Sequence, residues 1–225
     1  MFSTFFTVRY HPPAKLVSWH TVFQIYSTPV RLAKKIIFSL FTLFLVFRTV
    51  ELLRHVSYSR PIDFNLGESL LVAFLLCLFI TGIFAFPGFV FPTSRVMPDR
   101  YWKATNPKRL NYFFDLLGVE TFKSIMVILF WGKPKHQKRY YDGTREGLQN
   151  FLYQTRQSEF GHLGAWIVVS LVSVFLLVRQ YFLISSVLML LNLIANLYPV
   201  ILQRHHRIRI YALLERLPKP DVRKD

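Results

Sequence analysis

The chain has 225 residues, 52% of them hydrophobic, and a formal net charge of +16. A mean hydropathy of +0.32 and several long uncharged segments argue against an ordinary soluble domain. The basic residues cluster at the ends of apolar segments, which favours anionic lipid head groups over nucleic acid as their partner. The single cysteine, Cys77, excludes a disulfide within the chain, and we expect it to pack as a small hydrophobic residue.

The N-terminal part is predicted to contain a surface arm and a short first span. Residues 1–33 are rich in aromatic side chains but are interrupted by Pro12, Pro13 and Pro29, so we expect an arm that lies on the membrane surface and could bind a membrane protein partner. Residues 36–47 are apolar, and their pattern continues to Leu53. The flanking basic side chains can extend toward the interface, which makes this short run a first span.

The middle of the chain is predicted to contain one more span and one surface helix. Residues 69–86 form an uncharged run of eighteen, long enough to cross a membrane. The segment 110–131 differs, because polar side chains such as Asp115 and Lys123 fall on one side of a helical wheel and Phe114 on the other. This pattern predicts an amphipathic helix in the head-group plane.

The C-terminal part is predicted to form a helical hairpin. A helix starts near Thr144 and runs through His162 to Val178, and residues 181–202 form a second uncharged run of twenty-two. Only Arg179-Gln180 separates the two, so they should pack as antiparallel neighbours. The fold class is therefore all-α, an integral membrane protein with about four transmembrane helices plus an interfacial amphipathic helix.

The distribution of Lys and Arg predicts the orientation of these spans. The five segments outside the spans carry five, three, twelve, one and seven of these residues in chain order. The segments rich in basic residues alternate with the poor ones, and basic segments stay in the cytoplasm. We therefore expect a multi-pass protein with both termini cytoplasmic.

An ionisable pair at the entrance to the third span is the first functional candidate. Glu159 and His162 lie three residues apart and so share a helical face, where Glu159 could orient His162 as a general base. Counting back from the hairpin turn places polar side chains of both helices in one layer at the cytoplasmic interface: Arg156, Glu159, His162, Asn196, Gln203 and Arg204. Arg204, Arg207 and Arg209 could bind phosphates.

Simpler roles remain open for the same residues. Glu159 could pair with Arg156, His162 could make a packing contact, and the arginines could reach lipid phosphates. A metal site is not expected. Glu-x-x-His occurs once, whereas di-iron bundles need two copies, and the seven histidines, including His205-His206, are too few for the histidine boxes of membrane desaturases.

Two blocks of residues carry a family resemblance. The segment Thr155-Arg156-Gln-Ser-Glu159-Phe-Gly-His162 resembles the Thr-x-Arg-Ala-Glu-x-x-His-Trp segment of the bacterial glycosyl-4,4′-diaponeurosporenoate acyltransferase family. The run from Ala195-Asn196 through Gln203-Arg204 to Arg207-Ile-Arg209 resembles that family's C-terminal block. This sequence departs from the family at Leu163, where the family has Trp, at His205-His206 in place of Tyr-Asn, and at Ile208 in place of Pro.

The resemblance implies a division of the chain and a function. Residues 1–65 would be an added arm and first span, 66–217 an acyltransferase-like membrane domain and 218–225 a basic tail. The implied activity moves a fatty acyl group onto a sugar hydroxyl of a glycolipid or glycosylated carotenoid at the bacterial inner membrane. His162 and Glu159 would be catalytic, and the substrates would be bound by Arg156, Asn196, Gln203, Arg204, Arg207 and Arg209. No cofactor is expected to be bound; acyl-CoA or acyl-carrier protein would be the acyl donor.

Two other functions compete with the enzyme. The same polar groups could bind lipid head groups or a partner in a non-enzymatic membrane subunit, which the aromatic arm favours. A transporter fragment is less favoured, because the chain has no pair of broken helices in matching halves.

Overall fold

The structure is a computed structural model, and it describes residues 19–103, 105–126 and 144–216. The described part is helical, and four of its helical segments are long and apolar enough to cross a membrane, which confirms the predicted fold class. These segments are Pro29–Tyr58, Leu66–Gly88, Arg145–Val178 and Phe182–Arg216. Residues 1–18 of the predicted arm and the basic tail 218–225 lie outside the described residues.

The first two spans form a hairpin. Helix α1 (Trp19–Tyr58) is longer than predicted, since it includes Pro29 and residues 19–33 of the region expected to be a surface arm. A short 3-10 turn, η1 (Pro61–Asp63), leads to α2 (Leu66–Gly88). Asn65 starts α2 in a reciprocal capping box: its side chain accepts from the Glu68 amide at 2.9 Å, and the Glu68 carboxylate accepts from the Asn65 amide at 2.9 Å.

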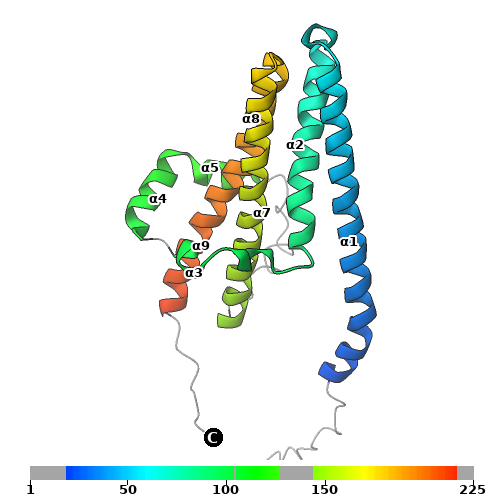
Figure 1. The fold of residues 1–225 in the computed structure, drawn as a ribbon. Coiled ribbons are helices and arrows are strands. Elements are labelled where there is room, and N and C mark those ends of the chain that lie inside the picture. The colour runs from blue at the N-terminus through cyan, green and yellow to red at the C-terminus, as the bar shows by residue number, and fades with distance from the viewer. Residues whose placement is uncertain (1–18, 104, 127–143, 217–225) are drawn as a thin grey trace, which may run out of the picture.

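The segment after α2 lies beside the lower half of the bundle. It contains η2 (Thr93–Val96), α3 (Asp99–Trp102), α4 (Pro107–Leu116) and α5 (Val119–Met126). The single amphipathic helix predicted over 110–131 is thus two helices, because Gly118 takes a positive φ of 68° that breaks the helix; residues 127–131 are outside the described part. Phe114, Val119 and Leu202 bury the apolar faces of α4 and α5 against α9, on the left in Figure 1.

The last two spans form the predicted antiparallel hairpin (Figure 1). Helix α7 (Arg145–Val178) is capped by Thr144 and runs unbroken through His162. Gln180 takes a positive φ of 68° at the turn. The second half of the hairpin contains α8 (Phe182–Asn192), a π-helical turn η4 (Leu193–Leu197) and α9 (Tyr198–Arg216).

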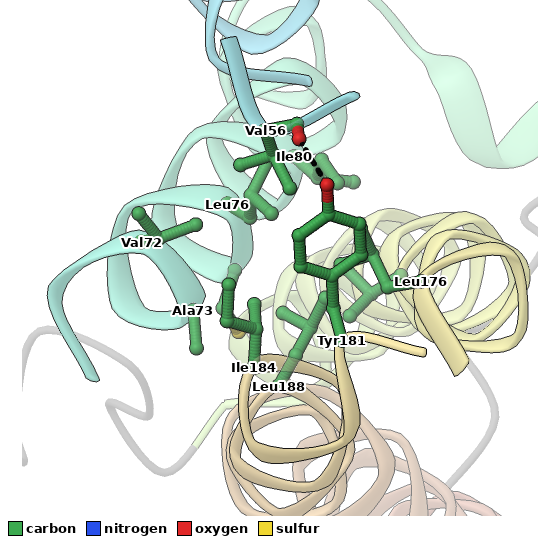
Figure 2. Packing of buried hydrophobic residues seen from close by; sticks show 11 residues of the cluster. Val56, Val72, Ala73, Leu76, Ile80, Leu176, Tyr181, Ile184 and Leu188 are labelled. Atoms are coloured by element: carbon green, nitrogen blue, oxygen red, sulfur yellow. Dashed lines mark hydrogen bonds between the residues drawn. The ribbon is translucent and has the colours of Figure 1, made fainter. Parts of the chain in front are cut away.

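The main core lies where α2, α7 and α8 meet near this turn. Figure 2 shows Leu76, Ile80, Leu176, Ile184 and Leu188 packed together, and all are buried. Tyr181 stands among them and donates a hydrogen bond of 2.6 Å to the carbonyl of Val56, which ties the hairpin to the end of α1. Burial of the ring and its hydrogen bond together fix how the two hairpins meet.

Gln157 joins α7 to the segment at the C-terminal end of α2. Its side-chain amide donates to the carbonyls of Gly88 and Phe91 at 3.1 and 2.6 Å, so Gln157 lies level with the end of α2. From Gln157 to Val178 α7 measures about 33 Å, close to the length of α2 and to a bilayer core. A bilayer core that matches the length of α2 would therefore begin near Gln157, and Glu159 and His162 would lie within its first two helical turns.

Candidate functional site

Glu159 is the centre of an ion cluster between α3, α7 and α9. Its side chain is completely buried. Oε1 accepts hydrogen bonds from the Tyr101 hydroxyl at 2.9 Å and from Nη2 of Arg204 at 2.8 Å. Oε2 lies 2.5 Å from Nη1 of Arg207 in an ion pair. A buried carboxylate is costly unless it is paired, and here two guanidinium groups face it: Arg204 through hydrogen bonds to Oε1, and Arg207 through a close charge contact at Oε2 that lacks hydrogen-bond geometry.

Aromatic rings of α3 hold the same guanidinium groups. The guanidinium carbon of Arg204 lies 4.9 Å from the centre of the Tyr101 ring, and that of Arg207 lies 5.0 Å from the centre of the Trp102 ring. Nε of Arg207 also donates to the Trp102 carbonyl at 3.1 Å. Trp102 is buried, so this short helix is anchored by cation–π contacts as well as by packing.

The charge of the cluster is unbalanced. Arg207 is buried and Arg204 is one-third exposed, but one carboxylate faces both. An arginine stays protonated in a protein, so the cluster keeps an excess positive charge. Burial and the negative charge of Glu159 raise the pKa of the neighbouring Tyr101 from its ordinary value of 10 to about 12, so its hydroxyl stays protonated into the alkaline range.

A surface pocket opens beside this cluster, between α3, α4 and α9. Its volume is about 530 Å³. The side chains of Arg100, Lys103, Arg109, Arg204 and Arg207 line it, together with Tyr101 and Tyr211. No acidic side chain lines it among the described residues. The pocket can therefore hold an anionic group next to aromatic surface.

His162 belongs to a second polar group, one turn deeper in α7. It is partly buried, and its Nδ1 lies 3.3 Å from Oδ1 of Asn196, in the π-helical turn. The same oxygen accepts from the Thr81 hydroxyl at 3.1 Å. Thr81 is seven residues, or about 10 Å along the helix, from the end of α2, so this group would lie inside a bilayer core that matches α2. Polar residues at such a depth mark functional sites by default.

The hydrogen bonds of Asn192 determine which nitrogen of His162 carries the proton. Nδ2 of Asn192 donates to the carbonyl of Trp166 at 3.1 Å, and a carbonyl can only accept. Oδ1 of Asn192 must then accept from Nδ2 of Asn196, 3.0 Å away, which leaves Oδ1 of Asn196 facing His162. Nδ1 of His162 therefore donates, and Nε2 keeps a free lone pair.

The predicted site residues thus fall into two neighbouring groups. Glu159 meets Arg204 and Arg207, and His162 meets Asn196, but no hydrogen bond joins Glu159 to His162 in the described structure. The hairpin count placed Glu159 in one layer with His162 and Asn196. Arg204 and Arg207 reach it instead, because the π-helical turn uses extra residues and arginine side chains are long.

The other predicted residues lie around these two groups. Arg156 does not pair with Glu159: it donates to the Tyr211 hydroxyl at 2.7 Å and lies 3.7 Å from Asp99. Arg209 is more than half exposed and pairs with Glu120 at 3.2 Å. The Lys123 ammonium beside Glu120 lowers the pKa of that carboxyl. Gln203 makes no hydrogen bond with another described residue.

Four important residues were missed in the sequence. Tyr101 and Trp102 stand between two basic residues in Arg100-Tyr-Trp-Lys103, a pattern that could have drawn attention to them. Asn192 precedes Asn196 by one helical turn in an otherwise apolar run, which also could have been noticed. Thr81 gives no such signal. Among the described residues, no three His, Cys, Asp or Glu side chains lie close enough to hold a metal ion.

Comparison with known proteins gives one family. The family described as glycosyl-4,4′-diaponeurosporenoate acyltransferase matches residues 98–216, more than half of the chain. The match covers α3 to α9 and leaves out α1 and α2. No curated protein and no solved structure matches the chain. The chain belongs to the glycosyl-4,4′-diaponeurosporenoate acyltransferase family, and this membership suggests an acyltransferase of carotenoid biosynthesis.

Proposed function

We propose that the protein is a membrane-embedded acyltransferase that moves a fatty acyl group from a thioester donor onto a sugar hydroxyl of a glycolipid or glycosylated carotenoid. The observation that carries this proposal is His162, whose Nδ1 is held by buried Asn196 and whose Nε2 is free to accept a proton. His162 also lies inside the region matched by the family.

The residues divide the reaction between them. Nε2 of His162 takes the proton of the sugar hydroxyl as its oxygen attacks the acyl carbonyl, so that a C–O bond forms. When the tetrahedral intermediate collapses, the C–S bond breaks and the thiolate leaves with the proton from the imidazolium. Asn196 keeps the ring oriented through Nδ1 in both states. Glu159 orients Arg204 and Arg207, in place of the contact with His162 expected from the sequence.

The depth of the site suits an amphiphilic acceptor. His162 would lie within a bilayer core that begins near Gln157, and the excess positive charge around Arg204 would lie near its edge. An acceptor with a long apolar part would remain in the lipid while its sugar reaches the interface. Nδ2 of Asn196 donates to Asn192, so we assign the amide that donates to the oxyanion to Gln203. The proposal places the reaction at the cytoplasmic face of a bacterial inner membrane.

The test is acyl transfer by the full chain in lipid nanodiscs, with acyl-CoA or acyl-carrier protein as donor and a glycosylated apocarotenoid as acceptor. His162→Gln should lower kcat by about 10²-fold or more, since a general base contributes at least that much. His55→Gln, at the far end of α1, is the matched control and should keep full activity. Undiminished transfer by His162→Gln would refute the assignment, and no transfer by the wild type would favour a non-enzymatic membrane subunit.

A further inference from the structure

The surface pocket between α3, α4 and α9 has the composition of a phosphate site. Five cationic side chains line it, and no carboxylate does so among the described residues. Arg100, Lys103 and Arg109 are exposed and form no ion pair with another described residue. Phosphate oxygens are strong acceptors for guanidinium and ammonium groups, so a phosphate-bearing ligand would satisfy charges that the chain itself leaves open.

The side chains at the floor of the pocket are held in place by contacts within the protein. Glu159 is completely buried and holds Arg204 and Arg207, while Tyr101 and Trp102 cover their guanidinium planes. Arg204 nevertheless remains one-third exposed toward the pocket. Binding to a preorganised site costs little conformational entropy. Two arginines with one carboxylate also leave the floor positively charged, which favours an anion.

The size and place of the pocket indicate what carries the phosphate. A volume of about 530 Å³ exceeds what a single phosphate needs and lies in the range of cofactor sites. The pocket extends from Arg204, near the membrane boundary, to Tyr211, seven residues or about 10 Å further along α9 and away from the hydrocarbon. A ligand there is reached from the aqueous side.

We infer that this pocket binds the phosphate groups of a soluble phosphopantetheine-type acyl donor, of which coenzyme A is the simplest probe. The inference rests on the proposed function, because it identifies the donor side of the same reaction. A phospholipid head group presents the same phosphate chemistry, and the experiment must therefore separate the two sources.

The experiment measures equilibrium binding of coenzyme A to the full chain in an uncharged detergent by titration calorimetry. The variant Arg100→Gln/Lys103→Gln/Arg109→Gln removes three exposed charges and leaves the buried cluster intact. Its Kd for coenzyme A should rise about tenfold or more. Lys108→Gln, which neighbours Arg109 but does not line the pocket, is the matched control and should bind within about twofold of wild type.

Further ligands separate the sources. Pantetheine, which lacks phosphate, should not bind, and short-chain phosphatidylglycerol should not displace coenzyme A. Equal binding of coenzyme A by the triple variant and the wild type would overturn the inference. It would also be overturned if phosphatidylglycerol bound more tightly than coenzyme A and the triple variant weakened that binding. The measurement needs no acceptor and no turnover. Coenzyme A binding without acyl transfer would therefore refute the proposed function alone, and transfer without binding at this pocket would refute the inference alone.

Discussion

The buried ion cluster gives the sharpest prediction about stability. Glu159→Gln keeps the size of the side chain but removes its charge, while Arg204 and Arg207 stay protonated. Breaking a buried ion pair from one side costs about 3–5 kcal/mol, because an unpaired charge remains in a poorly solvated place. For a chain of this size about 1 kcal/mol corresponds to a Tm change of roughly 2–4 °C, so the Tm should fall by roughly 6–20 °C.

The chain offers a direct assay for this change. Cys77 is its only cysteine and is 5% exposed, so a thiol-reactive dye reports unfolding of the detergent-solubilised protein on heating. Glu120→Gln is the control, since Glu120 is half exposed in its pairs with Lys123 and Arg209 and should lower Tm by less than about 4 °C.

A double variant tests the reasoning itself. Arg207→Met, made together with Glu159→Gln, removes one of the two cations that the first change leaves unpaired and replaces it with an apolar side chain. Its Tm should lie above that of Glu159→Gln alone. A Glu159→Gln shift no larger than that of Glu120→Gln would refute the argument that Glu159 neutralises buried charge.

Three further predictions concern single positions. Asn192→Leu frees the Asn196 amide to turn, so ¹⁵N NMR of labelled histidine should show His162 changing from the Nδ1–H tautomer to a mixture, with a lower kcat. Tyr101→Phe should reduce the loss of stability between about pH 10 and pH 12. The pKa of Tyr101 is about 12 in the folded state and about 10 in the unfolded state, so over this range only the folded state holds the proton and rising pH favours unfolding. Tm measured against pH reports this loss. Gly164→Ala places a Cβ 2.5 Å from Cδ1 of Phe84 and should cost about 1–3 kcal/mol in the dye assay.

Each of these has its own control. Ser185→Ala removes another buried hydrogen bond between α7 and α8, to the Ser173 carbonyl, and should leave the His162 spectrum unchanged. A spectrum equally unchanged in Asn192→Leu would contradict the tautomer argument. For Tyr101, an equal fall of Tm with rising alkaline pH in Tyr101→Phe and the wild type would contradict the pKa argument. Gly88→Ala meets only an ordinary contact of 3.7 Å and should be neutral; an equal effect at both glycines would contradict the packing argument.

The spans could be predicted from sequence because the membrane imposes a local requirement. A helix must present about twenty apolar residues in succession to cross hydrocarbon, and such a run is visible without knowledge of its neighbours. The hairpin turn at Arg179-Gln180 was visible for the same reason. The start of α1 differs from the prediction because the prolines of residues 1–33 indicate a surface arm, whereas α1 begins at Trp19 and continues through Pro29.

The partners of the site residues were decided by the tertiary structure. Spacing along one helix relates only residues on the same face, and on that basis Glu159 was expected to orient His162. In the fold, guanidinium groups from α9 and a hydroxyl from Tyr101, fifty-eight residues upstream, surround the carboxylate. A buried carboxylate pairs with the opposite charges nearest to it in space. His162 contacts the neutral side-chain amide of Asn196 in η4 instead. Sequence alone therefore determined which segments cross the membrane; only packing between helices decided which charged and polar groups meet there.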